Sequence, residues 1–404
     1  MLHPSIPAGE ELSLAKWAQS IRRSPLQDML FAASKPGIIS FAMGLPAPEF
    51  FPSRGFAQAC AQVLGHEPLA LQYNPPLRSL KKHVVELMSL RGVKCREEQV
   101  FLTTGAQQGM NLLVRLLLEP GGQVIAEELI YTGFQQVIEP FEPEVLTVPT
   151  DGEEGMNVQA VESLLRGGAR PAFIYAISDG HNPLGVSLSE DKRRHLVEVA
   201  RRYGVPILED DPYGFLFYGR EALPPLRAFD EDWVLYIGSF SKILAPALRV
   251  GWLVVPETII SQLSVVKEAS DIDTTTFSQR VISAFFDAQD IHAHLSTLRD
   301  EYRTRRDCMI QAITEHFPAS ARWRVPGSGL FLWINMPPEV NMLELLPAVL
   351  QTEQVAYIPG QAFGVGTVPL ATNCMRLNFS NCTPEKITEG IKRLGRVLKQ
   401  HTAA

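Results

Sequence analysis

Short apolar runs alternate with amphipathic stretches through the middle of the chain. The runs are rich in Val, Ile and Tyr and are bounded by Gly, Pro or Asp, a pattern that predicts β-strands. The stretches between them, such as residues 105–119 and 189–204, predict helices, and the second has the cap residues Ser189 and Gly204 at its ends. This alternation predicts an α/β domain with a mostly parallel sheet covered by helices on both faces. The predicted strands are residues 123–129, 172–178, 205–211, 233–239 and 251–257.

The same pattern divides the chain into two domains and an N-terminal arm. The alternating region predicts a large domain over residues 55–290. A long amphipathic helix over residues 291–317, a small sheet or hairpin and a final helix near residues 384–400 predict a smaller α+β domain over residues 291–404. Residues 1–54 are interpreted as an arm that also contributes to the smaller domain.

Composition and charge narrow the class of protein. The chain has 404 residues, of which 46% are hydrophobic, enough for a large core. Its net charge of −7 disfavours nucleic-acid binding through a general basic surface. No signal-peptide pattern opens the chain and no apolar run reaches about 18 residues, so we expect neither secretion nor a membrane span. The cysteines are scattered without a C-x-x-C pair, which favours a reducing compartment, and we expect a cytoplasmic protein. They are Cys60, Cys95, Cys308, Cys374 and Cys382.

Two pairs of residues of metal-binding types are not expected to bind a metal ion. His292 and His294 lie two positions apart on a predicted helix, so they do not share a face and would make a poor metal pair. Asp271 and Asp273 are interpreted as part of a polar loop. We therefore predict no metal site.

Polar motifs follow several of the predicted strands, where ligands bind in parallel sheets. One motif opens a helix, and its free backbone N–H groups and helix dipole suit a phosphate. Two others place a carboxylate, a phenol and an amide at strand ends. Taken singly, each motif has an ordinary interpretation as a capped helix or a turn. The candidate residues are Gly105, Ala106, Gln107, Asn182, Asp210 and Tyr213.

Lys242 lies between small hydroxyl residues and a long apolar run. Alone it is more often a surface or ion-paired lysine. Together with the strand-end motifs it fits pyridoxal 5′-phosphate, whose aldehyde forms a Schiff base with a lysine amine and whose ring nitrogen a carboxylate such as Asp210 keeps protonated. Ser239 and Ser241 can reach the phosphate, and Arg249 adds positive charge against it.

The run S-x-S-K-x-x-x-P-x-x-R-x-G over residues 239–251 is the most specific part of a wider resemblance. The chain resembles fold-type I pyridoxal-phosphate enzymes of the class I/II aminotransferase family, and is similar to the subgroup acting on 2-aminoadipate, aromatic and branched-chain amino acids. The resemblance covers nearly the whole chain. It implies a large domain with a mostly parallel seven-stranded sheet between helices, a smaller α+β domain, amino acid and 2-oxo acid substrates, and a homodimer with shared active sites.

The resemblance also implies roles for individual residues. Lys242 matches the lysine that forms the internal aldimine and moves the substrate proton. Asp210 matches the partner of the ring nitrogen, and Asn182 and Tyr213 match the partners of the ring O3′. Arg376 matches the arginine that grips the substrate α-carboxylate. The remaining matches are Gly105, Ala106 and Gln107 in the phosphate loop, Tyr131 stacked on the ring, and Tyr73 contacting the phosphate from the neighbouring subunit.

Four departures from the family pattern concern the surroundings of the substrate. Leu184 stands where the family has threonine, and Met43 replaces a glycine beside Gly44 near the substrate entrance. The loop over residues 72–78 is shortened. Gln27 stands where several relatives have an arginine for acidic side chains, which disfavours a dicarboxylic substrate.

Three functions are consistent with these residues. The first is an aminotransferase that works through a Lys242 aldimine and a quinonoid. The second keeps the cofactor but diverts the quinonoid to racemisation, elimination or replacement, or carbon–carbon bond formation, as the shortened loop and Leu184 suggest. The third is a non-catalytic effector-binding module like those fused to DNA-binding domains, which the lack of a preceding helix-turn-helix segment disfavours.

Overall fold

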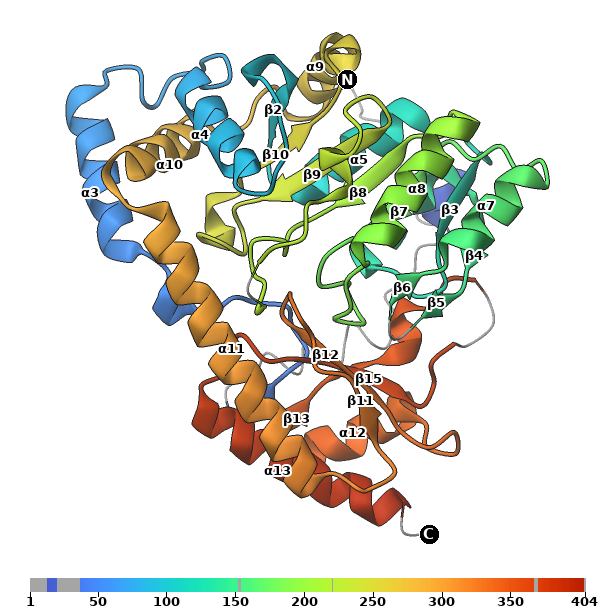
Figure 1. Ribbon diagram of the computed structural model, residues 1–404. Coiled ribbons are helices and arrows are strands. Elements are labelled where there is room, and N and C mark those ends of the chain that lie inside the picture. The colour runs from blue at the N-terminus through green and yellow to red at the C-terminus, as the bar shows by residue number, and fades with distance from the viewer. Residues whose placement is uncertain (1–12, 20–36, 152–153, 220, 367–369, 403–404) are drawn as a thin grey trace, which may run out of the picture.

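A seven-stranded sheet forms the centre of the larger part of the molecule (Figure 1). The computed structural model describes residues 13–19, 37–151, 154–219, 221–366 and 370–402. β10 runs antiparallel to both of its neighbours, whereas the other paired strands are parallel, so the predicted mostly parallel sheet is confirmed. In sheet order the strands are β2 (Val100–Thr103), β10 (Gly251–Val254), β9 (Val234–Ser239), β8 (Ile207–Asp210), β7 (Ile174–Ala176), β3 (Gln123–Glu127) and β4 (Glu144–Val148).

The two outer strands β2 and β4 were not among the predicted strands. β2 is only four residues long and follows a polar turn, so it lacks a long apolar run. β4 lies at the sheet edge and keeps exposed Glu144 and Thr147 along its length. β2 is buried but too short to stand out as a run, whereas β4 lacks the buried run on which the other five predictions relied.

Helices cover both faces of this sheet, as the alternating pattern predicts. One face packs against α5 (Ala106–Leu117), α6 (Thr132–Ile138) and α9 (Ile260–Asp271), and the other against α7 (Val158–Arg166) and α8 (Glu190–Tyr203). Consecutive strand residues alternate between the two apolar clusters: Ile207 belongs to the α7–α8 side and Leu208 to the α5 side.

Helix α8 begins and ends at the residues that the cap pattern predicts. The Ser189 hydroxyl accepts a hydrogen bond from the Lys192 backbone N–H, and Gly204 closes the helix at a φ of +67°. This left-handed conformation favours glycine because other residues have a Cβ that clashes there. Both predicted cap residues are therefore confirmed.

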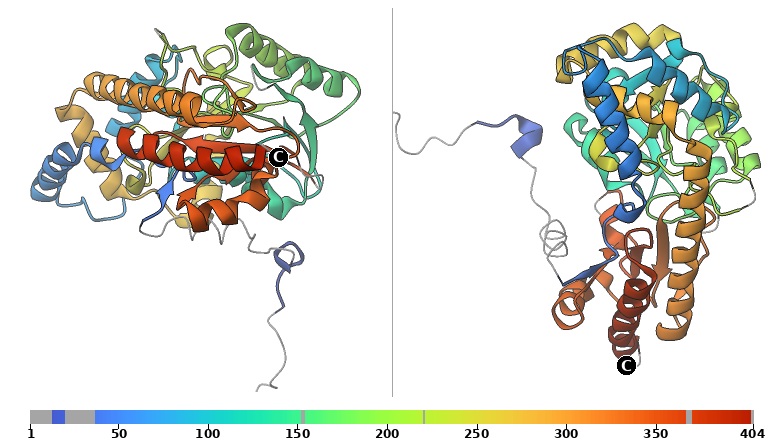
Figure 2. Two further views of the ribbon diagram at one scale, coloured as in Figure 1. Left: turned by 90° about the horizontal axis from the view of Figure 1, so that it is seen from below. Right: turned by 90° about the vertical axis from the view of Figure 1, so that its left-hand side faces the viewer.

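A smaller unit lies below the large sheet in Figure 1. The long helix α11 (Ile291–His316) reaches into it and packs along α13 (Pro384–Thr402), and Figure 2 shows the two helices side by side. The two predicted C-terminal helices are thus confirmed. The unit also holds α12 (Met342–Thr352) and a sheet of β11 (Arg322–Trp323), β12 (Phe331–Asn335), β15 (Cys374–Asn378) and β14 (Ile358–Pro359).

The N-terminal strand β1 (Ile39–Ser40) pairs in parallel with β13 (Val355–Ala356), so this part of the N-terminal segment lies against the smaller unit. The domain boundaries near residues 54 and 290 remain predictions. Within the described ranges, no helix is both long and apolar enough to cross a membrane.

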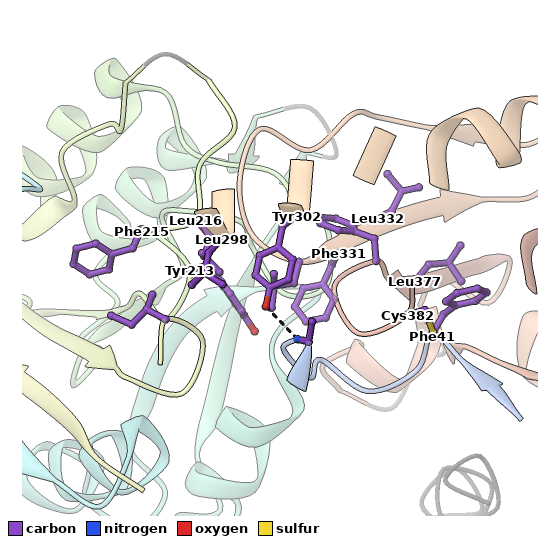
Figure 3. Close-up of a cluster of buried hydrophobic side chains, with 14 of the residues drawn as sticks. Phe41, Tyr213, Phe215, Leu216, Leu298, Tyr302, Phe331, Leu332, Leu377 and Cys382 are labelled. Atoms are coloured by element: carbon purple, nitrogen blue, oxygen red, sulfur yellow. Dashed lines mark hydrogen bonds between the residues drawn. The ribbon is translucent and has the colours of Figure 1, made fainter. Parts of the chain in front are cut away.

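An apolar cluster joins the large and small units (Figure 3). The Tyr213 ring, just after β8, meets the Phe331 ring of β12 edge to face, with 5.6 Å between centroids. The Tyr302 hydroxyl on α11 accepts a hydrogen bond of 3.1 Å from the Ala47 backbone N–H. Residues from distant parts of the sequence therefore meet in this one cluster.

Two helical glycines test the packing of α13 against α11. A Cβ at Gly395 would collide with the backbone carbonyl oxygen of His316, whereas a Cβ at Gly65 in α3 (Ser53–His66) has no atom within 4 Å. Alanine favours a helix by about 1 kcal/mol over glycine, but forced overpacking costs about 1–3 kcal/mol. We expect Gly395→Ala to lower the free energy of unfolding and Gly65→Ala to leave it unchanged or raise it, as measured by urea unfolding. Equal stabilisation by both variants would contradict the close helix contact.

Candidate active site

The ends of the central strands and the small unit enclose a cavity of about 540 Å³. β8 ends at Asp210 and β9 at Ser239, and α5 begins at Ala106 on the same edge of the sheet. The structure therefore brings together most of the residues predicted from the sequence. Those lining the cavity are Met43, Gly44, Ala106, Gln107, Tyr131, Asn182, Asp210, Tyr213, Ser239, Ser241, Lys242, Arg249 and Arg376.

A few residues singled out in the sequence lie elsewhere. Tyr73 is 77% exposed and lines a separate recess of about 550 Å³. Leu184 is buried in an apolar cluster with Trp333 and Phe363 and does not line the cavity, so its replacement of threonine changes packing behind the wall. Gln27 lies outside the described residues.

Lys242 follows β9 and points its amine into the cavity. The Nζ atom donates a hydrogen bond of 2.8 Å to the Gly44 carbonyl oxygen. Burial lowers the pKa of Lys242 to about 8, and the positive charges of Arg376 and Arg249 add to the effect. A substantial fraction of this amine is therefore neutral near pH 7–8, the form that attacks an aldehyde.

Asp210 presents a buried carboxylate at the end of β8. Its Oδ2 accepts a hydrogen bond of 2.8 Å from the Tyr175 hydroxyl on β7. Burial raises the pKa of Asp210 to about 7, and the Tyr175 hydrogen bond opposes this rise. A buried carboxylate is costly unless a cation pairs with it, and a protonated ring nitrogen is such a partner.

The start of α5 lines the cavity and could hold an anion. Gly105 has a φ of +83°, and a Cβ there would meet the Arg249 guanidinium, so only glycine lets that side chain approach. The Arg249 Nη2 donates a hydrogen bond of 3.2 Å to the Thr104 carbonyl oxygen. The unpaired N–H groups of the first helical turn, with Ser239 and Ser241 nearby, fit a phosphate group.

A second set of contacts holds this loop from behind. The Asp271 carboxylate accepts hydrogen bonds from the Thr104 hydroxyl (2.8 Å) and from the Lys267 amine (2.7 Å). Lys267 also donates to the Gln108 side chain at 3.0 Å. Asp271 therefore ties α9 to the loop before α5.

Arg376 is a buried cation on β15. Its Nη1 donates a hydrogen bond of 2.6 Å to the Asn182 side-chain oxygen, and its Nη2 donates one of 2.6 Å to the Ala42 carbonyl oxygen. The guanidinium lies 4.2 Å from the Phe331 ring centroid and 4.9 Å from that of Phe363. Its Nε has no hydrogen-bond partner within the described chain. Burial lowers the pKa of Arg376 to about 10, so it stays charged at neutral pH and fits a carboxylate ligand.

Tyr131 and Tyr213 line the cavity as phenols. Burial raises the pKa of Tyr131 and of Tyr213, so both keep their protons at neutral pH. The Tyr131 hydroxyl lies 3.4 Å from the Gln107 side-chain oxygen. The Gln107 amide donates a hydrogen bond of 2.8 Å to the Gly133 carbonyl oxygen. Gln107 therefore links the α5 loop to the start of α6.

A buried ion-pair network lies behind the loops that carry Asn182 and Asp210. Arg193 Nη2 lies 2.7 Å from Asp179 Oδ1, and Arg91 Nη2 lies 2.7 Å from Asp179 Oδ2. Arg91 Nη1 also lies 3.0 Å from Asp211 Oδ2. The two guanidinium groups hold the pKa of Asp179 below its usual value. This network was not predicted, because Arg193 lies in a stretch whose many charged residues are typical of an exposed helix.

Several lining residues were not predicted from the sequence. Leu45 comes from the segment after β1, and the others come from strands and turns of the small unit. Nothing in their local pattern distinguishes them from core residues. Only the docking of the two units brings them to the cavity. They are Leu45, Phe331, Ile358, Ala362 and Phe363.

Comparison with known proteins agrees with this site. The family model for aminotransferase class I and II matches residues 47–394. The chain belongs to this family. The predicted family membership and the predicted pyridoxal-phosphate-dependent aminotransferase fold are thus confirmed.

Individual members of the aminotransferase family are similar over most of their length. The chain is 34% identical to aromatic-amino-acid aminotransferase 1 of Thermococcus litoralis, over 95% of this chain and 93% of that protein. It is 34% identical to the 2-aminoadipate transaminase of Thermus thermophilus, over 96% of each chain. Its structure is similar to that of Pyrococcus horikoshii kynurenine aminotransferase in complex with PMP, with a TM-score of 0.91, 33% identity, and coverage of 97% of this chain and 98% of that chain.

The lowered pKa of Lys242 leads to a testable pH dependence. Because only the neutral amine attacks an aldehyde, we expect the rate of covalent attachment of pyridoxal phosphate to the apoprotein to rise with pH through a midpoint near 8. Arg376→Gln removes a nearby positive charge and should move the midpoint upward. Stopped-flow absorbance gives the rate, and borohydride fixation followed by peptide mapping gives the attachment site.

The control for this measurement is Lys242→Ala, which should leave no cofactor fixed at this position. A midpoint near the ordinary lysine value of 10.5, with no change in Arg376→Gln, would contradict the desolvated amine.

Proposed function

We propose that this aminotransferase moves an amino group between an L-amino acid and a 2-oxo acid, with pyridoxal 5′-phosphate held at Lys242. The observation that carries this proposal is the convergence of the Lys242 amine, the Asp210 carboxylate and the start of α5 on one cavity. When bound, the cofactor supplies an electron sink for negative charge that develops at the substrate Cα. The residues proposed to hold it are Gly105, Ala106, Gln107, Tyr131, Asn182, Asp210, Tyr213, Ser239, Ser241 and Arg249.

Lys242 is proposed to move the substrate proton as well as to hold the cofactor. General acid–base groups work best when their pKa lies near the working pH, and the pKa of Lys242 is lowered to about 8. The Gly44 carbonyl oxygen lies within hydrogen-bond distance of the amine and can orient it between transfers. These features support one residue accepting the proton at Cα and returning it.

Arg376 is proposed to bind the substrate α-carboxylate. The Asn182 and Ala42 contacts each hold one Nη atom of the guanidinium, and the Phe331 and Phe363 rings limit its movement. A carboxylate would supply the counter-charge that this buried cation lacks among the described residues. A fixed carboxylate orients the bond to be broken, which accounts for a large part of the rate in such reactions.

The substrate side chain is proposed to be apolar or aromatic. The cations lining the cavity, counted over the described residues, are Lys242, Arg249 and Arg376, and each already has a proposed ligand. The lining also includes apolar side chains such as Ile358 and Phe331. No described cation remains for a second carboxylate, in line with the expectation from Gln27.

A homodimer is proposed because an apolar surface surrounds Tyr73. Leu71 is 78% exposed and Tyr73 is 77% exposed, and Leu69 and Leu64 are also largely exposed. Several large apolar side chains exposed within one short segment support a protein interface there. We propose that Tyr73 enters the partner's active site.

A cytoplasmic location is proposed from the cysteine chemistry. All five cysteines are free in the structure. Free thiols persist in a reducing compartment.

Substrate choice and reaction type can be tested together. We expect purified holoenzyme to transfer the amino group from aromatic and aliphatic amino acids to a 2-oxo acid at least about tenfold faster than from aspartate or glutamate, because an unpaired carboxylate in an apolar wall is costly. Chromatography of the new amino acid measures the transfer. Racemised or eliminated product without a new amino acid would overturn the proposal in favour of another reaction of the same cofactor.

Shared active sites predict complementation between two inactive variants. In a mixed dimer of Lys242→Ala and Tyr73→Ala chains, one site carries both defects and the other carries neither. After unfolding and refolding an equal mixture, we expect about a quarter of wild-type activity, since half of the dimers are mixed and each has one intact site. No recovery above the two separate variants would contradict a site that includes the partner subunit's Tyr73.

A further inference from the structure

The Tyr175 hydroxyl donates a hydrogen bond to the Asp210 carboxylate. Tyr175 has no role in the function proposed above. It lies on β7, whose register pairs Tyr175 with Leu208 of β8. Asp210 lies two residues beyond Leu208, so its side chain points to the same face of the sheet. The long Tyr175 side chain therefore reaches diagonally along this face to the strand end.

The Tyr175 ring is held in place before it reaches Asp210. It stacks on the Phe134 ring with 3.7 Å between centroids and 2° between planes. Phe134 belongs to α6, the helix that begins directly after Tyr131 of the cavity wall. Both rings are buried. Because the ring cannot move freely, the position of its hydroxyl is set by the packing of α6 on the sheet.

The hydroxyl acts only as a donor here. Burial raises the pKa of Tyr175 well above its ordinary value, so it keeps its proton. A donor facing a carboxylate favours the ionised form, and such charge-assisted bonds are stronger than those between neutral groups. The contact thus counteracts the burial that favours a neutral Asp210.

The next residue, Asp211, provides a matched comparison. Asp211 Oδ2 accepts a hydrogen bond of 3.1 Å from the Tyr236 hydroxyl of β9, the strand on the other side of β8. Asp211 does not line the cavity and is paired with Arg91. Two buried tyrosines from the two neighbouring strands therefore each bind one of two consecutive carboxylates, and only Asp210 lines the cavity.

We propose that Tyr175 is a positioning residue: its hydroxyl holds one oxygen of the Asp210 carboxylate, so that an ionised and correctly oriented carboxylate meets the cofactor ring nitrogen. This inference rests on the proposed function. It adds a residue that does not itself line the cavity and acts through Asp210.

The test compares Tyr175→Phe with Tyr236→Phe, since each variant removes one buried hydroxyl bonded to an aspartate. The measured quantity is the dissociation constant of pyridoxal phosphate, from titration of the apoprotein. We expect Tyr175→Phe to weaken binding about tenfold, the size expected for a hydrogen bond to a charged group. Tyr236→Phe should change the constant by no more than about twofold. Far-UV circular dichroism and thermal unfolding of both apoproteins establish that both variants fold.

A second measurement separates positioning from general loss of packing. In an Asp210→Ala background, adding Tyr175→Phe should not weaken cofactor binding further, because the two residues act as one unit. Adding Tyr236→Phe in that background should have the same small effect as in the wild type. In the holoenzyme, Tyr175→Phe should lower kcat about tenfold and leave the KM for the amino acid within about twofold, as expected when substrate binding is unaffected.

The inference and the proposed function fail in different ways. If the wild-type protein binds the cofactor and Tyr175→Phe binds it as tightly as Tyr236→Phe does, the inference is overturned and the proposed function stands. Additive effects of Tyr175→Phe and Asp210→Ala would also overturn it. If the wild-type protein itself binds no pyridoxal phosphate, the proposed function and this inference are overturned together.

Discussion

The loops that follow β7 and β8 depend on two buried arginines. Arg193 grips the Asp179 carboxylate with two nitrogens, and Arg91 bridges Asp179 to Asp211. Removing one partner from a buried ion pair leaves an uncompensated charge and costs about 3–5 kcal/mol. Arg91 follows α4 (Arg78–Ser89), so the network also connects the segment after Tyr73 to both loops. The network therefore ties the segment after β7, which carries Asn182, to the residue that follows Asp210.

The cavity itself is built from charges that burial disfavours. The pKa of Asp210 is raised, and the pKa values of Lys242 and Arg376 are lowered, in each case mainly by loss of water. Each shift means that the charged form of the group lacks compensation in the free protein. A ligand with a phosphate, a protonated ring nitrogen and a carboxylate would compensate all of these regions at once. Binding such a ligand would stabilise the folded chain by mass action as well as equip it for catalysis.

The cavity also depends on the docking of the two units. Phe331 from the small sheet contacts the Tyr213 ring (Figure 3). It also contacts the Arg376 guanidinium, and Arg376 reaches across to Asn182 in the loop after β7. The proposed groups for the substrate carboxylate and for the cofactor therefore belong to one connected set of contacts. A shift of one unit relative to the other would move Arg376 and its aromatic supports away from the strand ends.

The sequence alone determined the fold class and the central part of the candidate site. Lys242, Asp210, Asn182 and the loop before α5 lie within a few residues of a strand or helix end, so local structure and the parallel order of strands bring them to one edge. The Tyr175–Asp210 contact was not predictable, because it depends on the register between β7 and β8. The same holds for the buried ion pairs of Asp179 with Arg91 and Arg193, and for the part of the cavity lining that includes Phe331 and Phe363. These contacts form only when distant segments pack together. Charge and hydrophobicity describe each residue separately, whereas burial and pairing are properties of the assembled structure, and only the tertiary structure decided them.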